Sequence, residues 1–127
     1  MIVDDDDDDR EFFCAAIAEI DDNIKCLGAI NGEDALHRLN CDLEHKPDFI
    51  FLDLNMPRMN GLRCLSEIKG DTNLKDIPVI IYSTTSSQRE TEQILQRGAT
   101  FFINKPTSLT KLREDILQVM EKIGISV

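Results

Sequence analysis

The chain has 127 residues, of which 42% are hydrophobic and 30% charged, and its formal net charge is −10. This length suits a single domain at 1–127, and the hydrophobic share suffices for a core without metals or disulfides. The excess of acids argues against a nucleic-acid partner and permits a divalent cation or a partner with a basic patch. No apolar run approaches the ~20 residues that cross a bilayer. Because aspartates follow Met1 to Val3 directly, no signal peptide is predicted, and we expect a cytoplasmic protein without a membrane partner.

The four cysteines, Cys14, Cys26, Cys41 and Cys64, form no CxxC pair, and His37 and His45 lie apart from them. Their spacing matches no zinc pattern. We therefore predict reduced, partly buried thiols.

Short apolar runs rich in Ile, Val and Phe alternate with stretches of helical spacing. The runs predict five strands, at roughly 1–4, 24–29, 48–53, 77–83 and 100–104. The helical stretches carry their apolar residues at Phe13, Ile17 and Ile20; Leu36, Leu39 and Leu43; Leu62, Leu65 and Ile68; Ile94 and Leu95; and Leu109, Leu112, Ile116, Val119 and Ile123.

Turn and cap residues agree with these boundaries. Asn31-Gly32 and Asn60-Gly61 precede the second and third helices. Gly98 can end the fourth helix in a left-handed turn, and Ser108 can cap the fifth.

Strands that alternate with helices predict an α/β fold with a parallel sheet, covered by helices on both faces. The strands lack alternation of apolar and polar residues, as expected when both faces are buried. We expect the doubly wound, flavodoxin-like order 2-1-3-4-5 with five helices, and a ligand site beyond the carboxyl ends of strands 1 and 3.

Polar residues follow the predicted strands at these ends. Asp4 and Asp5 follow the first strand, Asp53 ends the third, Ser83-Thr84 ends the fourth, and Lys105-Pro106 ends the fifth. Three carboxylates at close range repel strongly, so a cation must offset them, and hard oxygen ligands with access to water suit Mg²⁺. The same set suits a phosphoryl group: a carboxylate attacks phosphorus, while an ammonium and a hydroxyl contact its oxygens.

The six consecutive aspartates from Asp4 to Asp9 could also be a solvated acidic tail, which is the usual reading of an acidic run. Because they lie between a strand and an amphipathic helix, we assign Asp4 and Asp5 to the site. We expect one of Asp7 to Asp9 to cap the first helix, and we leave Asp6 unassigned.

Five segments match a known family in order: "IVDDD" at 2–6, "FLDLNMPRMNG" at 51–61, "PVIIYST" at 78–84, "GATFFINKP" at 98–106 and, more weakly, "NGEDAL" at 31–36. With these motifs the chain resembles the receiver domain of two-component response regulators, the chemotaxis-regulator-like fold. The likeness covers nearly the whole sequence. The chain departs from the family in a short first strand and a longer acidic run.

The resemblance implies roles for the residues at the strand ends. Asp53 is expected to be the phosphoacceptor. Mg²⁺ would be held by Asp5 directly, by Asp4 largely through water, by Asp53, and by the backbone carbonyl of Asn55. No other cofactor is implied.

Further roles concern the response to phosphorylation. Ser83, with Thr84 beside it, would bond a phosphoryl oxygen and move, and Lys105 would pair with another oxygen. Phe102 stands at the position of the switch aromatic, and Pro106 at that of the family's cis proline. Asn55 and Thr85 predict slow to moderate self-dephosphorylation.

The expected function is that of a phosphoprotein switch rather than an enzyme. A sensor histidine kinase or a phosphotransfer protein would donate to Asp53, and the product would change affinity for a downstream effector protein. Alternatives are a phosphorelay intermediate, a Mg²⁺-dependent phosphatase with an aspartyl nucleophile, a degenerate receiver that only binds partners, and a flavodoxin-like cofactor binder. A homodimer through helix 4, strand 5 and helix 5 is a further expectation.

Overall fold

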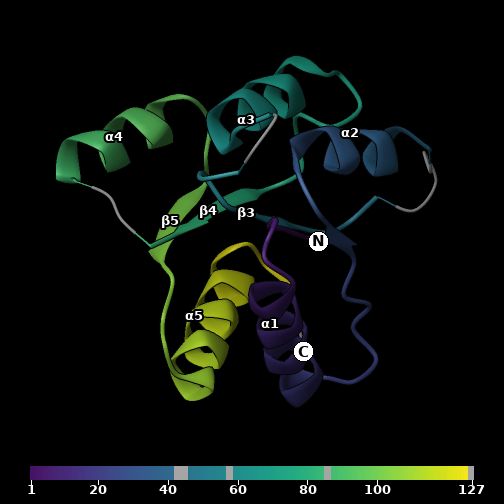
Figure 1. Cartoon of the computed structure of the whole chain (residues 1–127), viewed down its shortest axis with the longest axis vertical. Helices are drawn as coiled ribbons and strands as arrows, with labels where there is room; N and C mark the ends of the chain where they lie inside the picture. Colours follow the sequence, from purple (N-terminus) through teal and green to yellow (C-terminus); the bar gives the residue numbers. More distant parts are fainter. Residues whose placement is uncertain (42–45, 57–58, 85–86, 126–127) are drawn as a thin grey trace.

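A computed structural model describes residues 1–41, 46–56, 59–84 and 87–125. Within these ranges strands and helices alternate along the chain (Figure 1). The strands are β1 (Ile2–Val3), β2 (Gly28–Ala29), β3 (Ile50–Leu52), β4 (Val79–Ser83) and β5 (Phe101–Asn104). The helices are α1 (Asp7–Ile20), α2 (Gly32–Cys41), α3 (Gly61–Gly70), α4 (Gln88–Gln96) and α5 (Leu109–Lys122).

The strands form one parallel sheet in the order β2-β1-β3-β4-β5, which confirms the predicted fold class. β1 lies between β2 and β3, with Ile2 opposite both Gly28 and Phe51. Several strands are shorter than predicted. Because β1 contributes only two residues to the ladder, β2 pairs over two residues instead of the six from 24 to 29.

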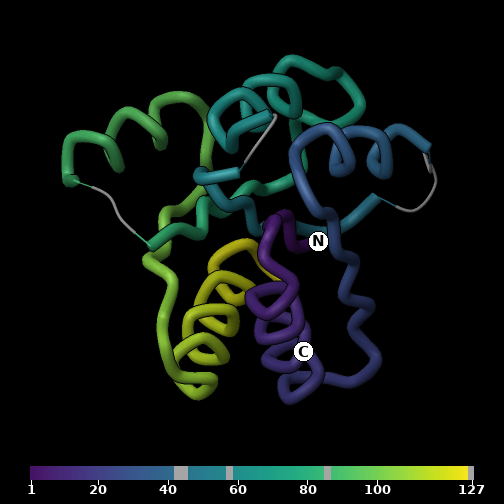
Figure 2. The backbone as a smooth tube through the Cα atoms, viewed as in Figure 1, coloured from purple at the N-terminus to yellow at the C-terminus, as the bar shows by residue number. Residues whose placement is uncertain are grey.

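Helices cover both faces of the sheet, with α2, α3 and α4 on one face and α1 and α5 on the other (Figure 1). Successive strand residues therefore face different apolar clusters: Ile80 and Tyr82 belong to the cluster of α1 and α5, and Val79 and Ile81 to the other. All five residues of β4 are buried, which explains the missing alternation. Figure 2 follows the chain from β1 into α1 and shows α1 beside α5.

Side-chain caps fix where most helices begin. Asn60, Ser87 and Ser108 accept hydrogen bonds from backbone N–H groups in the first turns of α3, α4 and α5. Asn31 accepts one from Asp34 N at the start of α2. At α1 the cap is Asp6, which accepts from Asp8 N and Asp9 N. The prediction that one of Asp7 to Asp9 caps this helix is wrong, because all three residues already lie within its first turn.

Two other predictions need correction. Cys14 and Cys26 form a disulfide, so the prediction of reduced thiols is wrong for this pair. Their Cα atoms lie 5.7 Å apart, within the usual span of a disulfide, because α1 runs beside the segment that leads to β2. The prediction of a cis peptide bond before Pro106 is also wrong, because the described residues contain no cis peptide bond. Trans is the favoured form of a bond before proline.

The remaining predictions on helices agree or lie outside the described residues. Gly98 has φ 107 and follows α4 in the left-handed region, as predicted. Leu43, which extends the apolar pattern of α2, lies outside the described residues. Within the described part of the chain, no helix combines the length and the apolar character that a membrane span requires.

Candidate functional site

The carboxyl ends of β1, β3, β4 and β5 bring their polar residues to one edge of the sheet. Asp4 follows β1 and Asp53 follows β3. A hydrogen bond joins the two strands here, because Asp53 N donates to Val3 O at 3.0 Å. Ser83 ends β4, and its carbonyl accepts from Lys105 N at 2.8 Å. Parallel pairing therefore places the acids and the lysine side by side at this edge, as predicted from the strand ends.

Three carboxylates gather at this edge. One ligand oxygen each from Asp4, Asp5 and Asp53 lies within 4.8 Å of the others. Asp4 and Asp53 are buried, while Asp5 is exposed. Oxygen ligands that combine burial with access to water suit a hard divalent cation. The residues present therefore fit a metal site of the kind that the sequence predicts.

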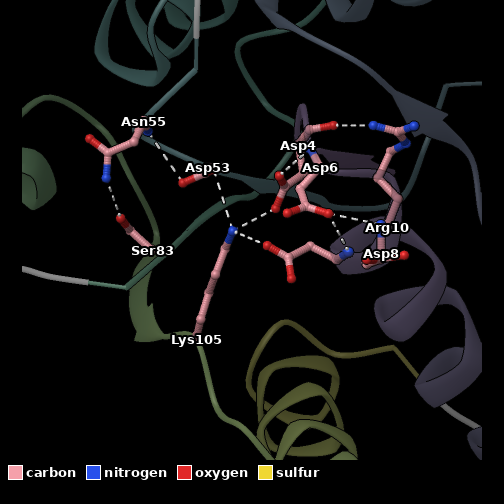
Figure 3. Close-up of polar contacts among 9 residues, drawn as sticks. Asp4, Asp6, Asp8, Arg10, Asp53, Asn55, Ser83 and Lys105 are labelled. Atoms are coloured by element: carbon pink, nitrogen blue, oxygen red, sulfur yellow. Dashed lines mark hydrogen bonds and ion pairs between the residues drawn. The ribbon is translucent and has the colours of Figure 1, made fainter.

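Lys105 supplies the positive charge of the cluster. Its Nζ lies 2.6 Å from Asp4 Oδ2, 2.9 Å from Asp9 Oδ2 and 3.4 Å from Asp53 Oδ2. In Figure 3 it points from the end of β5 into the space between Asp53 and Asp4. Three carboxylates thus contact one ammonium, and Asp5 adds a fourth negative charge nearby, which leaves excess negative charge for a further cation.

Burial and charge act on the pKa values of the site in opposite directions. Burial raises the pKa of Asp53, the ammonium of Lys105 and the N–H of Asn55 lower it, and the charge of Asp4 raises it; the net shift is upward. For Lys105, burial lowers the pKa, but hydrogen bonds to Asp4 and Asp9 outweigh burial, so its pKa lies above the ordinary value. Lys105 is therefore a fixed cation at neutral pH.

Asn55 links the acids to the hydroxyl of the site. Its backbone N–H donates to Asp53 Oδ1 at 3.2 Å, and its side-chain Nδ2 donates to Ser83 Oγ at 3.3 Å (Figure 3). Ser83 is fully buried. Because its oxygen accepts from Asn55, the hydroxyl proton remains available to a further acceptor.

Gly61, at the start of α3, allows the backbone there to come close to the end of β3. A Cβ at this position would lie 2.3 Å from the carbonyl oxygen of Asp53 and 2.6 Å from the Cα of Leu54. The backbone of Gly61 also donates from its N–H to Leu54 O at 3.1 Å. Only glycine permits this approach, which holds the backbone of Asp53 against the start of α3.

Not every residue predicted for the site joins it. Thr84 is exposed one residue beyond β4 and makes no polar contact with the cluster among the described residues. Phe102 is half-buried and packs against the apolar cluster that contains Ile81 and Ile94. Thr85 lies outside the described residues.

Asp9 is a site residue that the sequence reasoning missed. The sequence predicts it only as one of three candidate caps of α1, yet its carboxylate contacts Lys105. The available signal was its place in the first turn of the helix that follows β1. Such a turn lies beyond the carboxyl edge of the sheet, where ligands bind.

Comparisons with known proteins agree with this architecture. The family model for the response regulator receiver domain matches residues 1–117. A protein-glutamate methylesterase/protein-glutamine glutaminase of Clostridium acetobutylicum is 39% identical over 125 residues, which is 93% of this chain. The chain spans only about a third of that relative and of a similar one from Syntrophomonas wolfei.

Two further relatives are matched over most of their own length. The polar-differentiation response regulator DivK of Brucella anthropi is 33% identical over 87 residues, or 68% of this chain and 71% of that one. The crystal structure of the phosphorylated cyanobacterial phytochrome response regulator RcpA is 28% identical with a TM-score of 0.78, covering 94% of this chain and 89% of that one. The chain therefore belongs to the response regulator receiver domain family of two-component signalling proteins.

Proposed function

We propose that this receiver domain accepts a phosphoryl group on Asp53 from a phosphohistidine and thereby changes its affinity for a partner protein. The observation that carries the proposal is the meeting of Asp53 with two other carboxylates, a lysine and a buried hydroxyl at one sheet edge. Membership in a family of signalling receivers supports phosphoryl acceptance as the use of these residues.

The chemistry assigned to Asp53 is nucleophilic attack on phosphorus. One Oδ atom forms a bond to phosphorus, the bond from phosphorus to the imidazole nitrogen of the donor breaks, and its electron pair stays on that nitrogen. The product is an acyl phosphate. Burial favours this role, because it raises the pKa of Asp53 and disfavours its free charge, while the ammonium of Lys105 lowers that pKa and so favours the ionised form that attacks.

The neighbours of Asp53 stabilise the charge that the phosphoryl group brings. Lys105 pairs with one phosphoryl oxygen, and the hydroxyl of Ser83 donates its hydrogen bond to another. Asp4, Asp5, Asp53 and the backbone carbonyl of Asn55 would hold Mg²⁺, which supplies positive charge to the phosphoryl oxygens when bound. Thr84 is at most an auxiliary hydroxyl, since it is exposed beyond the strand.

The output surface in this proposal is formed by α4, β5 and α5. The only buried residue of α4 is Ile94, and the exposed fraction of Leu95 is 40%. Phe102 packs against the cluster that includes Ile94, so a displacement of Ser83 and Lys105 at the strand ends can reach α4 through this ring. An effector protein, or a second copy of the chain, would bind this surface with different affinity in the two states.

The remaining parts of the proposal concern enzymatic activity and the location of the protein. The receiver family is typically not a family of catalytic enzymes, and we propose no activity here beyond self-catalysed phosphoryl uptake and loss. The phosphatase alternative needs a second acid two residues after the nucleophile, where this chain has Asn55. We further propose that residues 1–127 act as one receiver domain in the cytoplasm, with a sensor kinase or phosphotransfer protein as donor.

The test is phosphorylation by acetyl phosphate with Mg²⁺, read by intact mass and by mapping of the modified residue. The wild-type chain should gain one phosphoryl group, and Asp53→Asn should gain none. Asp76→Asn, which removes the same charge from an exposed position outside the site, should behave as wild type. Equal labelling of Asp53→Asn at another residue would show that the acceptor has been assigned wrongly.

A further inference from the structure

Lys105 is held by more carboxylates than the phosphoryl chemistry requires. Its ammonium contacts Asp4 from the end of β1, Asp53 from the end of β3, and Asp9 from α1. Asp9 Oδ2 lies at 2.9 Å, closer than Asp53 Oδ2 at 3.4 Å. In this state the ammonium therefore sits nearer to α1 than to the residue whose phosphoryl group it is proposed to neutralise.

The backbone around Asp9 is fixed by its own hydrogen bonds. Asp9 N donates to Asp6 Oδ1 at 3.3 Å, and Asp6 N donates to Asp4 Oδ1 at 3.0 Å. Arg10 Nη1 donates to the backbone oxygen of Asp4 at 2.7 Å. The first turn of α1 is thus tied to the end of β1, and the carboxylate of Asp9 is presented to Lys105 from a stable position.

A second contact of Lys105, with the ring of Tyr82, acts together with the contact to Asp9. Its Nζ lies 5.4 Å from the centre of the Tyr82 ring, a cation–π distance. Tyr82 is buried in the apolar cluster of α1 and α5, where its ring contacts Phe13 and Phe51. Asp9 and Tyr82 therefore both hold the ammonium toward the face of the sheet that α1 and α5 cover.

We propose that Asp9 is a positioning residue for Lys105, which restrains the ammonium in the unphosphorylated protein and thereby slows its pairing with the phosphoryl group on Asp53. This inference rests on the proposed function of Asp53. Asp9 and the phosphoryl oxygens compete for one cation, so removing the carboxylate of Asp9 should favour the phosphorylated arrangement. The opposing effect, weaker attraction of Mg²⁺ to a less negative site, disappears when Mg²⁺ is saturating.

The experiment compares Asp9→Asn with two variants at saturating Mg²⁺. Asp8→Asn removes the same charge from the same turn at an exposed residue whose side chain has no contact with Lys105 among those described. Asp9→Glu keeps the charge. Asp9→Asn should raise the rate constant for phosphorylation by acetyl phosphate about three- to fivefold, the effect of one partly exposed ion pair. Asp8→Asn should change it by less than about 1.5-fold, because exposed charges are screened, and Asp9→Glu should stay near wild type.

A second readout follows Lys105 without any phosphodonor. The side-chain resonance of Lys105, labelled with ¹³C at Cε and assigned through its loss in Lys105→Arg, should shift in Asp9→Asn and not in Asp8→Asn. Circular dichroism checks that each variant is folded.

The outcomes separate the two proposals. If wild type is phosphorylated on Asp53 but Asp9→Asn and Asp8→Asn have equal rates, the positioning role is wrong and the proposed function stands. If wild type accepts no phosphoryl group, the proposed function fails and the kinetic role of Asp9 fails with it. In that event an unchanged Lys105 resonance in Asp9→Asn would also refute the contact itself.

Discussion

The carbonyl oxygen of Asp53 lies where a side chain on Gly61 would have to be, since a Cβ there would approach it to 2.3 Å. At this point the start of α3 and the end of β3 approach each other backbone to backbone. This contact sets the position of the loop that carries Asn55 and the backbone of the proposed phosphoacceptor.

The first prediction concerns this packing. Gly61→Ala forces the backbone of Asp53 or Leu54 to move and should lower the free energy of unfolding by about 1–3 kcal/mol. Gly70→Ala is the matched control in the same helix, because its Cβ would meet nothing within 4 Å. It should be neutral or stabilising by about 0.5–1 kcal/mol, as expected for glycine replaced by alanine in a helix. Urea unfolding of both variants measures the difference, and equal stability of the two would contradict the contact.

The second prediction uses the only tyrosine of the chain, which has no tryptophan. Burial raises the pKa of Tyr82 to about 12, although the nearby charge of Lys105 lowers it. The unfolded chain ionises its tyrosine near 10, so protonated Tyr82 contributes stability that is fully present below pH 10 and is lost as the pH rises through about 12. Near-ultraviolet absorbance of tyrosinate follows this group alone.

A variant tests the role of Lys105 in that titration. Lys105→Met removes the cation 5.4 Å from the ring and leaves the acids in place, so the titration should move to higher pH than in wild type. Lys75→Met is the control, because it removes a cation from an exposed position that does not act on the pKa of Tyr82. A titration near 10 in wild type would show that Tyr82 is not buried as described.

The site residues that lie at strand ends could be predicted from the sequence. Asp4, Asp53, Ser83 and Lys105 could be placed together because parallel strands end at one edge, and the strands could be recognised from their composition. Gly98 and Ser108 could be assigned because a left-handed turn and an N-cap have specific residue preferences.

What the sequence did not reveal depends on helix rotation and on packing between distant segments. The contact between Asp9 and Lys105 requires the rotational position of α1 relative to β5, which a uniform run of aspartates does not encode. The same run hid Asp6 as the cap, since every candidate was the same residue type. The pairing of Cys14 with Cys26 depends on how α1 lies against the segment before β2.

The third prediction concerns this disulfide. It closes a loop between residues 12 apart in sequence, so reduction should lower the free energy of unfolding by about 2–3 kcal/mol, mainly by freeing the unfolded chain. Melting with and without dithiothreitol should show a lower Tm in the reduced protein, and Cys14→Ser should melt low in both conditions. Cys41→Ser alters a free, exposed thiol and should keep the wild-type response to reductant. Identical melting of wild type in both conditions would show that the bond does not form.

The fourth prediction separates the chemical role of Ser83 from its structural role. Its hydroxyl accepts from Asn55 Nδ2 at 3.3 Å, and Asn55 is exposed, so water can replace this bond in Ser83→Ala. The loss of stability should be at most about 1 kcal/mol. Phosphorylation should suffer more, because a hydrogen bond to a charged oxygen is worth about 1.5–3 kcal/mol, or tenfold and more in rate. Ser83→Thr keeps the hydroxyl and should retain most of the rate. If Ser83→Ala and Ser83→Thr are phosphorylated by acetyl phosphate at the same rate, the hydroxyl has no part in binding the phosphoryl group.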